Sequence, residues 1–341
     1  MITLGIESSC DETAVAVLKN SNQVLSSKIA SQLSHNRFGG VIPEIAAREH
    51  LQAIVPLYEQ ALEEAQVSSS GIDLVCVTQG PGLIGALLVG TSFAKGLAQA
   101  LKKPLVPVNH VHAHIHGALL GLDHEAKEIF PSLALVVSGG HTHLYYMKKS
   151  TDFQLLASSI DDACGECFDK IAKLLGLPYP GGPAIEALAK KGNPRAIPMP
   201  RMMDQKDRLE FSYSGLKTHV RYLLEREKDS LTPERIQDVC ASFQQEAFEQ
   251  ILRKLKHAQT LFPDVRSVLV SGGVAANACF RDLLARSLTI PSHFPSVKFC
   301  ADNAAMIAAL GQKLYEEAPE RGVFQKYDWE SFSRYEVGAK I

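Results

Sequence analysis

Short apolar runs that end in small polar residues alternate along the chain with stretches of helical periodicity. Residues 4–18 and 133–146 each contain an apolar run, a turn of small polar residues and an alternating return stretch, which predicts a β-hairpin in each place. Residues 73–97 and 267–284 each contain an apolar run, a glycine-rich loop and a helical pattern. Because the two patterns recur in the same order, they predict an internal duplication of two α/β lobes.

The remaining pattern suggests how these lobes are divided. We expect one lobe in residues 1–128, a second in 129–299, and a segment 300–341 that returns to the first. Pro233–Lys256 has one apolar stripe, and Ala304–Leu314 is small and apolar enough for a buried helix that crosses between lobes. Residues 192–212 have no periodicity, which predicts an irregular insertion near the cleft. Trp329 lies in the tail, where surface cover or a partner contact is expected.

Composition indicates a globular protein of about two domains. The chain has 341 residues, of which 46% are hydrophobic and 21% charged, so a largely disordered chain is excluded. Its net charge of −2 leaves no overall basic character, so nucleic-acid binding would need a local patch or a partner. The basic residues in 195–208 and 253–257 are by default interpreted as a solvated face, and they are the best local candidates for an RNA backbone footprint.

The chain lacks the sequence features of secreted and membrane proteins. No uninterrupted apolar run reaches the ~18 residues of a membrane span, and the first residues show no secretory signal. Seven scattered cysteines favour free thiols in a reducing cytosol, so we expect a cytoplasmic protein. Cys164 and Cys167 form one CxxC spacing, which we interpret as two small residues on a helix face and not as a zinc or redox site.

The densest chemical signal is a run of alternating histidines, His110, His112, His114 and His116. Apolar residues between and after them follow helical spacing, and Asn109 suits the N-cap of that helix. On a helix the histidines form two i, i+4 pairs on different sides. Either pair could hold a divalent cation, which we favour over a surface histidine cluster without metal. The HExxH pattern of zinc proteases is absent.

Three further features suggest polar chemistry. Asp302 opens the small apolar helix, where a capping role is favoured over a third metal ligand. Asp11 and Glu12 lie in the first hairpin turn, where they could orient water, support a metal or accept a proton, or simply form the turn. Four glycine-rich turns in repeated order favour a phosphate-bearing ligand, and Asp169 precedes a Gly-Gly turn from which it could contact a ribose.

Several motifs together resemble one known family. The segments GIESSCDET, TQGPGLIGALLVG, VSGGHT, DDACGECFDKIAKLLGLPYPGGP, FSYSGLKT and SGGVAAN occur in the order of the tRNA threonylcarbamoyladenosine transferase family, over residues 2 to 312. The resemblance implies the two-lobed actin/Hsp70/sugar-kinase-like (ASKHA) α/β fold. It also implies transfer of a threonylcarbamoyl group from threonylcarbamoyl-AMP to N6 of adenosine-37, in tRNAs that read codons beginning with A, with release of AMP.

The resemblance also implies roles for individual residues. By this resemblance the metal ligands for Fe²⁺ or Zn²⁺ are His110, His114 and Asp302, and the acidic residues near the metal are Asp11 and Glu12. The phosphate-binding turn corresponds to Val136, Val137, Ser138, Gly139 and Gly140, and the adenosine-ribose contacts to Asp169, Gly182 and Asn277. Cys164 and Cys167 depart from the family pattern, which has small residues there, as does Asn109, where some members have His.

The implied partners are tRNA, threonylcarbamoyl-AMP and helper proteins. In bacteria the family works with an inactive paralogue that dimerises with it and with a small P-loop ATPase, whereas mitochondrial members act alone; a homodimer is a further option. Residues 56–62 and neighbouring apolar helix positions are candidates for a partner face. The alternative functions are a small-molecule kinase of the same fold, which would form ADP, and a regulatory ATPase, which would bind nucleotide without modifying tRNA.

Overall fold

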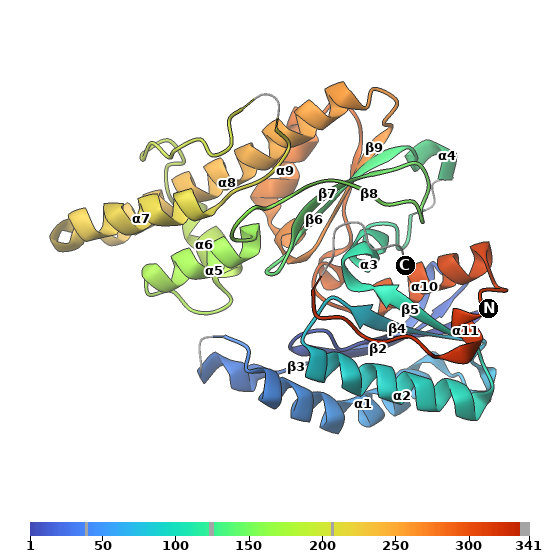
Figure 1. Cartoon of the computed structure of the whole chain (residues 1–341). Helices are drawn as coiled ribbons and strands as arrows, with labels where there is room; N and C mark the ends of the chain where they lie inside the picture. The colour runs from blue at the N-terminus through green and yellow to red at the C-terminus, as the bar shows by residue number, and fades with distance from the viewer. Residues whose placement is uncertain (38–39, 123–125, 206–207, 335–341) are drawn as a thin grey trace. The chain divides into compact units, whose positions relative to one another are not determined.

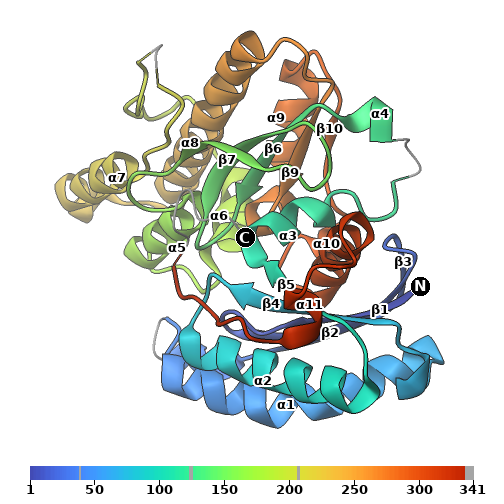
Figure 2. The same cartoon turned by 45° about the vertical axis from the view of Figure 1, so that its right-hand side comes forward.

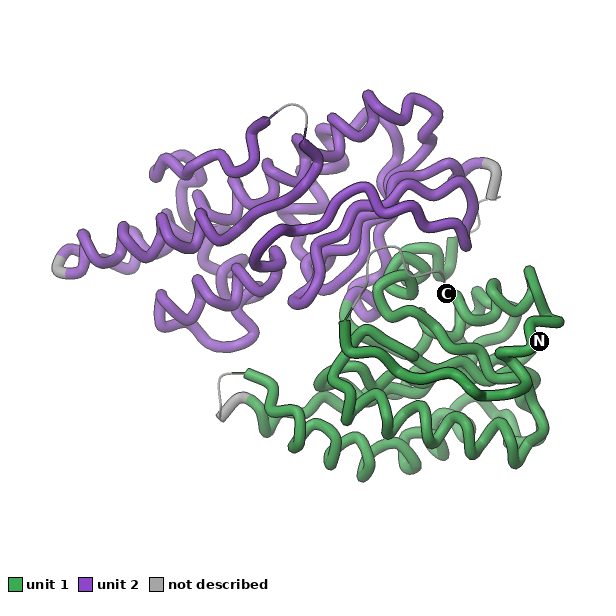
Figure 3. Tube along the Cα trace, viewed as in Figure 1, with its two compact units in different colours: residues 1–124, 301–341 green, residues 125–300 purple. Residues whose placement is uncertain are grey.

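The chain forms two compact α/β units. The computed structural model describes residues 1–37, 40–122, 126–205 and 208–334. Unit 1 comprises Met1–His124 and Ala301–Ile341, and unit 2 comprises Glu125–Cys300 (Figure 3). Each unit is built on its own five-stranded sheet.

The sheet of unit 1 combines an antiparallel meander with two parallel strands. Its order is β3-β2-β1-β4-β5; β1 pairs antiparallel with β2, and parallel with β4. Nearly all residues of β1 are buried, as expected for a central strand covered on both faces. The strands are β1 (Ile2–Glu7), β2 (Glu12–Lys19), β3 (Gln23–Ser31), β4 (Leu74–Gly80) and β5 (Leu105–Asn109).

Helices cover both faces of this sheet. In Figures 1 and 2, α1 and α2 lie side by side on one face, and α3 and α10 lie together on the other. The close approach of α10 requires Gly5, because a Cβ there would lie 2.1 Å from the carbonyl oxygen of Ala304. The helices of unit 1 are η1 (Leu33–Arg37), α1 (Pro43–Ala65), η2 (Ser69–Gly71), α2 (Ile84–Leu101), α3 (His110–Gly117), α10 (Ala304–Glu317) and α11 (Val323–Lys326).

The sheet of unit 2 repeats the topology of the first. Its order is β10-β9-β6-β7-β8, in which β6 to β10 take the places of β1 to β5. The antiparallel pairs β6-β7-β8 and the parallel pairs β6-β9-β10 also correspond. This equivalence confirms the internal duplication. The strands are β6 (Ser132–Val137), β7 (Thr142–Met147), β8 (Gln154–Ser158), β9 (Ser267–Ser271) and β10 (Ser292–His293).

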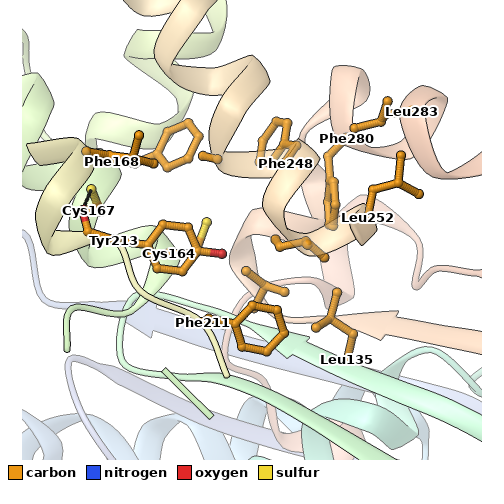
Figure 4. Close-up of a cluster of buried hydrophobic side chains, with 14 of the residues drawn as sticks. Leu135, Cys164, Cys167, Phe168, Phe211, Tyr213, Phe248, Leu252, Phe280 and Leu283 are labelled. Carbon is orange, nitrogen blue, oxygen red and sulfur yellow. Dashed lines mark hydrogen bonds between the residues drawn. The ribbon is translucent and has the colours of Figure 1, made fainter. Parts of the chain in front are cut away.

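Unit 2 has a large aromatic core between its sheet and its helices. Phe168 and Phe280 both stack on Phe248, with ring centroids 5.5 Å and 4.7 Å apart (Figure 4). The helices are α4 (Ala126–Ile129), α5 (Cys164–Leu174), α6 (Gly181–Ala189), α7 (Ser214–Arg226), η3 (Lys228–Ser230), α8 (Pro233–Leu261), η4 (Gly273–Ala276), α9 (Ala278–Ser287) and η5 (Val297–Phe299).

The CxxC cysteines belong to this core. Cys164 and Cys167 are fully buried on α5 beside Tyr213 (Figure 4). Burial raises the pKa of the Cys164 thiol to about 12, which suppresses the thiolate that redox chemistry needs. The interpretation as packing residues is therefore confirmed, and all seven cysteines of the chain are free thiols.

Of the two basic clusters, the one at residues 253–257 makes polar contacts within unit 2. Lys254 is buried, and its Nζ donates hydrogen bonds to the carbonyl oxygens of Met203 (2.5 Å) and Arg208 (2.7 Å). Arg253 pairs with Glu246 at 2.7 Å. Lys254 therefore holds Met203 and Arg208 of the irregular segment in place, and the expectation that Lys254 contacts an RNA backbone is wrong.

The C-terminal tail covers α2, the one helix among the described residues that is long and apolar enough to span a membrane. This helix packs on β4 and α1. The ammonium group of Lys95 on α2 lies 4.3 Å from the ring centroid of buried Trp329 and donates a hydrogen bond to the Trp329 carbonyl (2.7 Å). These contacts place one side of α2 against unit 1, and they agree with a covering role for Trp329.

Candidate functional site

The helix α3 begins where the sequence predicts. The Asn109 side chain accepts hydrogen bonds from the backbone N–H groups of Val111 (2.9 Å) and His112 (3.1 Å), which makes it the N-cap. His110 and His114 are therefore one helical turn apart on the same face. Their ring centroids are 4.7 Å apart.

Asp302 meets this histidine pair from the start of α10. One nitrogen from each of His110 and His114 and one oxygen from Asp302 all lie within 4.8 Å of one another. The Asp302 Oδ1 atom is 3.1 Å from the Nε2 of His114 and 3.6 Å from the Nε2 of His110. The structure thus selects the pair 110/114 and adds the carboxylate, whereas the buried pair His112 and His116 lies outside this group.

The donor set fits a divalent metal ion. The Nε2 of His114 is buried and makes no hydrogen bond within the part of the chain that the structure describes. The Asp302 carboxylate lies 3.1 Å from this atom without a hydrogen bond to it, and a cation between the two groups would bind both. Two imidazoles and one carboxylate are a common catalytic ligand set for zinc, and the same set binds ferrous iron. This cluster can therefore hold a metal ion.

The capping role favoured for Asp302 is wrong. The N-cap of α10 is the next residue, Asn303, whose side chain accepts a hydrogen bond from the backbone N–H of Met306 at 3.0 Å. Asp302 precedes the cap and turns its carboxylate toward the histidines. A single-residue shift in the start of the helix decides between the two roles.

Glu7, the last residue of β1, contacts His110 at the ring nitrogen opposite the one that approaches Asp302, and no motif in the sequence singles it out. Its Oε2 lies 2.9 Å from the Nδ1 of His110 and accepts a hydrogen bond from the Thr78 hydroxyl at 2.6 Å. Although burial raises the pKa of the Glu7 carboxyl, the nearby His110 brings it below its ordinary value. A Glu7 carboxylate that accepts the Nδ1–H leaves the Nε2 lone pair for a metal. The available signal was an acidic residue at the end of an otherwise apolar strand.

The first hairpin carries two adjacent acidic residues. Asp11 lies in the turn and Glu12 begins β2. Burial, together with repulsion from Asp302 and Asp11, raises the pKa of Glu12 to about 9. A cation bound nearby would act in the opposite direction and lower the pKa of Glu12, because it favours the ionised carboxylate.

The first glycine-rich turn of unit 2 is open to a ligand. It is closed by a hydrogen bond from the backbone N–H of Ser138 to the carbonyl of His141 (2.8 Å), and Val136 and Val137 are buried in the preceding strand. Gly139 and Gly140 are exposed, and a Cβ on either would meet no atom within 4 Å. Their backbone can be approached closely by an anion.

Two further glycine segments border this turn. Strands β6 and β9 are parallel neighbours, with Val136 opposite Ser271, so the loops after them lie at the same edge of the sheet. Gly272 follows β9, has a φ of +91°, and lies against the backbone of Val137 at the end of β6. A Cβ at position 272 would collide with the Val137 carbonyl oxygen. On the other side, the backbone N–H of Gly165 at the start of α5 donates to the Ser138 carbonyl at 3.1 Å.

The three expected ribose contacts lie near the starts of α6 and α9. Asp169 accepts a hydrogen bond from the N–H of Gly181 at 2.7 Å, and burial raises the pKa of its carboxyl. Gly182 has open space around its Cβ position. Asn277 caps α9 through Phe280 (3.1 Å) and donates to Gln244 (2.8 Å). Each of the two polar side chains thus has a structural partner as well.

Comparison with known proteins agrees with these features. The TsaD family model, described as tRNA N6-adenosine threonylcarbamoyltransferase, matches residues 23–309. A relative with that name from Moorella thermoacetica is 47% identical, and the match covers 92% of this chain and 91% of the relative. One from Chlamydia muridarum is 45% identical, and the match covers 97% of this chain and 98% of the relative. Another relative, from Bacillus subtilis, is 44% identical over 96% of this chain and 93% of its own.

Solved structures support the fold. The Acidaminococcus fermentans (R)-2-hydroxyglutaryl-CoA dehydratase component A is similar with a TM-score of 0.53 and 15% identity, over 94% of this chain and 100% of its own. The activator of 2-hydroxyisocaproyl-CoA dehydratase from Clostridium difficile is similar with a TM-score of 0.52 and 13% identity, over 94% of this chain and 97% of its own. They confirm the ASKHA fold. With the family match over most of its length, this chain belongs to the tRNA N6-adenosine threonylcarbamoyltransferase family.

Proposed function

We propose that this chain transfers the threonylcarbamoyl group of threonylcarbamoyl-AMP to N6 of adenosine-37 in tRNAs that read codons beginning with A. The observation that supports this most directly is the convergence of His110, His114 and Asp302 in a member of this family. In the reaction a bond forms between N6 and the carbamoyl carbon, the bond from that carbon to the phosphate oxygen breaks, and N6 loses a proton. AMP leaves with the electron pair of the broken bond as negative charge on its phosphate.

The metal ion in this proposal is Fe²⁺ or Zn²⁺, held by His110, His114 and Asp302. When bound, such an ion polarises a carbonyl oxygen or stabilises the oxyanion that develops on it, which an aromatic amine needs because it is a poor nucleophile. Glu7 orients His110 for this task. Asp11 and Glu12 are the nearby acidic groups for orienting the transferred group and moving the N6 proton.

Unit 2 would hold the adenylate. The N–H groups of Gly139 and Gly140, in the turn that the Ser138 N–H closes, are suited to the phosphate, whose negative charge increases as AMP leaves, and buried Val136 and Val137 fix the start of that turn. Asp169, Gly182 and Asn277 would contact the ribose and adenine. The acceptor base lies in an anticodon loop, where taking it out of its stack costs little.

Replacing Glu7 by glutamine is expected to weaken metal binding about 10–100-fold. The glutamine amide is nearly the same size as the carboxylate, but it carries no charge. Its NH₂ group also replaces one of the two oxygens that accept hydrogen bonds from the Ser9 backbone N–H and from the His110 Nδ1–H. Metal affinity is measured by competition with a chromogenic chelator. Thr78→Val, which removes only the hydroxyl donor to Glu7, is expected to have a smaller effect. Equal affinity of Glu7→Gln and wild type would contradict the orienting role.

The decisive test of the proposed function is nucleoside mass spectrometry. The purified chain is incubated with tRNA, threonylcarbamoyl-AMP and the helper proteins, and the tRNA is digested and analysed for threonylcarbamoyladenosine. We expect the modified nucleoside and stoichiometric AMP. Formation of ADP from ATP with a small-molecule acceptor, without modified tRNA, would instead indicate the kinase.

The proposed protein partners are the inactive paralogue and the small P-loop ATPase, in the cytoplasm. The candidate face at residues 56–62 needs correction, because Leu57 and Leu62 are buried in the core of unit 1. The exposed apolar side chains of α1 and α2 are Leu51, Val55, Ile84 and Leu88. Both helices run antiparallel to the parallel strands β1, β4 and β5, and therefore parallel to each other. Ala47 of α1 meets Gly85 of α2. Leu51 and Leu88 each lie one helical turn after that contact. We define these four residues as the α1–α2 face and assign the paralogue to it.

The double substitution Leu51→Asp with Leu88→Asp is expected to weaken association with the paralogue by about 30-fold or more, because two apolar contacts become charged. These side chains are 67% and 53% exposed, so thermal stability should change little. Binding is measured by calorimetry. Leu261→Asp, at a residue that is also 53% exposed but lies on α8 of unit 2, is the control. If both variants bind the paralogue as wild type does, the partner lies elsewhere.

A further inference from the structure

The turn between β1 and β2, residues 8–11, is held in place by several parts of unit 1. The backbone N–H of Leu83 donates to the Ser9 carbonyl at 2.8 Å, and that of Gln32 donates to the Asp11 carbonyl at 3.0 Å. The remaining carbonyl between them, that of Cys10, accepts from a side chain. Its partner is the Nε2 of His50, at 2.9 Å.

His50 lies on α1, fully buried, and uses both ring nitrogens toward this hairpin. Its Nδ1 is 2.7 Å from the hydroxyl of Thr13, the residue after Glu12. A carbonyl oxygen can only accept, so Nε2 carries the proton and Nδ1 accepts from the Thr13 hydroxyl. Burial lowers the pKa of His50 despite the nearby carboxylates, which agrees with this neutral form. The two bonds hold residues immediately before and after Asp11 and Glu12.

We propose that His50 is a positioning residue that fixes the acidic pair Asp11 and Glu12 for the transfer reaction. It acts through the backbone at Cys10 and the side chain at Thr13, on both sides of that pair. The inference rests on the proposed function for its catalytic consequence. Its structural part concerns the order of the turn alone and can be tested without activity.

Substitutions at position 50 separate the two bonds. Glutamine places an amide N–H where Nε2 lies and keeps the bond to Cys10, whereas leucine keeps the volume and loses both bonds. We expect His50→Leu to lower kcat about 10–100-fold, because a displacement of the order of 1 Å has that effect on a positioned group. KM for threonylcarbamoyl-AMP should change less than threefold, since the proposed adenylate contacts belong to unit 2. His50→Gln should restore kcat to within about fivefold of wild type.

Thr13 provides a second, milder test. Thr13→Val removes the hydroxyl with little change of shape, and Thr13→Ser retains it. We expect Thr13→Val to lower kcat and Thr13→Ser to leave it near the wild-type value. This pair keeps the proposal testable should His50→Leu fail to fold.

The matched control is Ser26→Ala. The Ser26 hydroxyl on β3 donates to the Ala61 carbonyl of α1 at 2.7 Å, so this variant also removes a buried bond between α1 and the sheet, far along the helix from His50. We expect lower thermal stability and unchanged kcat. A merely structural role for His50 predicts the same result for His50→Leu, and that outcome would overturn the proposal.

Hydrogen exchange distinguishes failure of this inference from failure of the proposed function. In His50→Leu, the amides of residues 8–13 should exchange at least tenfold faster than in wild type, while those of β4 stay protected. Unchanged exchange in residues 8–13 overturns the positioning role whatever the activity. Faster exchange in a chain whose wild type transfers no threonylcarbamoyl group would retain the structural part and contradict only the function.

Discussion

Replacement of both His110 and His114 by alanine is expected to lower threonylcarbamoyl transfer at least about 10³-fold and to leave the chain folded. The activity is lost because a single aspartate cannot retain a divalent ion, and stabilisation of a developing oxyanion is worth about 10²–10³ for one donor alone. The fold is retained because alanine is a strong helix former and the Asn109 cap is untouched. Glu7 keeps its hydrogen bonds from Thr78 and Ser9.

The measurements are metal content, circular dichroism and the rate of tRNA modification. The matched control is the double substitution of His112 and His116 by alanine, which removes two buried histidines of the same helix at the same spacing but outside the metal group. We expect this control to bind metal. If the His110/His114 variant contained no metal and still modified tRNA at the wild-type rate, the role of the ion would be refuted.

Gly139→Val is expected to weaken binding of threonylcarbamoyl-AMP about 100-fold without loss of stability. The position is exposed, a Cβ there meets no protein atom within 4 Å, and Gly139 is not among the glycines with positive φ. The protein can therefore accept the side chain. The phosphate of the ligand cannot, because valine would occupy the space in front of the N–H groups that are proposed to hold it, and one such donor is worth about 10²-fold.

Binding to Gly139→Val is measured by calorimetry with a non-hydrolysable adenylate, and stability by thermal unfolding. Gly96→Ala, on α2 of unit 1, is the control, since its Cβ position is equally open. Gly139→Ala should fall between the wild type and the valine variant, because it adds one methyl group. Wild-type affinity in Gly139→Val would exclude this turn as the phosphate site.

The features that follow from local periodicity could be predicted. The spacing of apolar residues around His110 and His114 indicates a helix, and the short polar side chain of Asn109 marks its start; the structure confirms both. The order of strands and glycine loops indicates a duplicated α/β fold, which the two equivalent sheets confirm. These features depend on hydrogen bonds between residues a few positions apart, or on the order of elements along the chain.

Other features depend on which distant segments meet. Asp302 approaches the histidines because α10 packs on β1 and α3, and Glu7 supports His110 because β1 ends beside that helix. Lys254 looked like part of a basic surface, yet its ammonium group anchors a loop.

The sequence by itself thus determined the repeated elements, the helix with its paired histidines and the open glycine turns. Only the tertiary structure decided which histidine pair receives a carboxylate, that Asn303 and not Asp302 caps α10, that Glu7 contacts His110, and that His50 bonds to the β1–β2 hairpin. The physical reason is that helix periodicity and turns are set by neighbouring residues. The partner of a buried polar group is set instead by the order and packing of whole strands and helices.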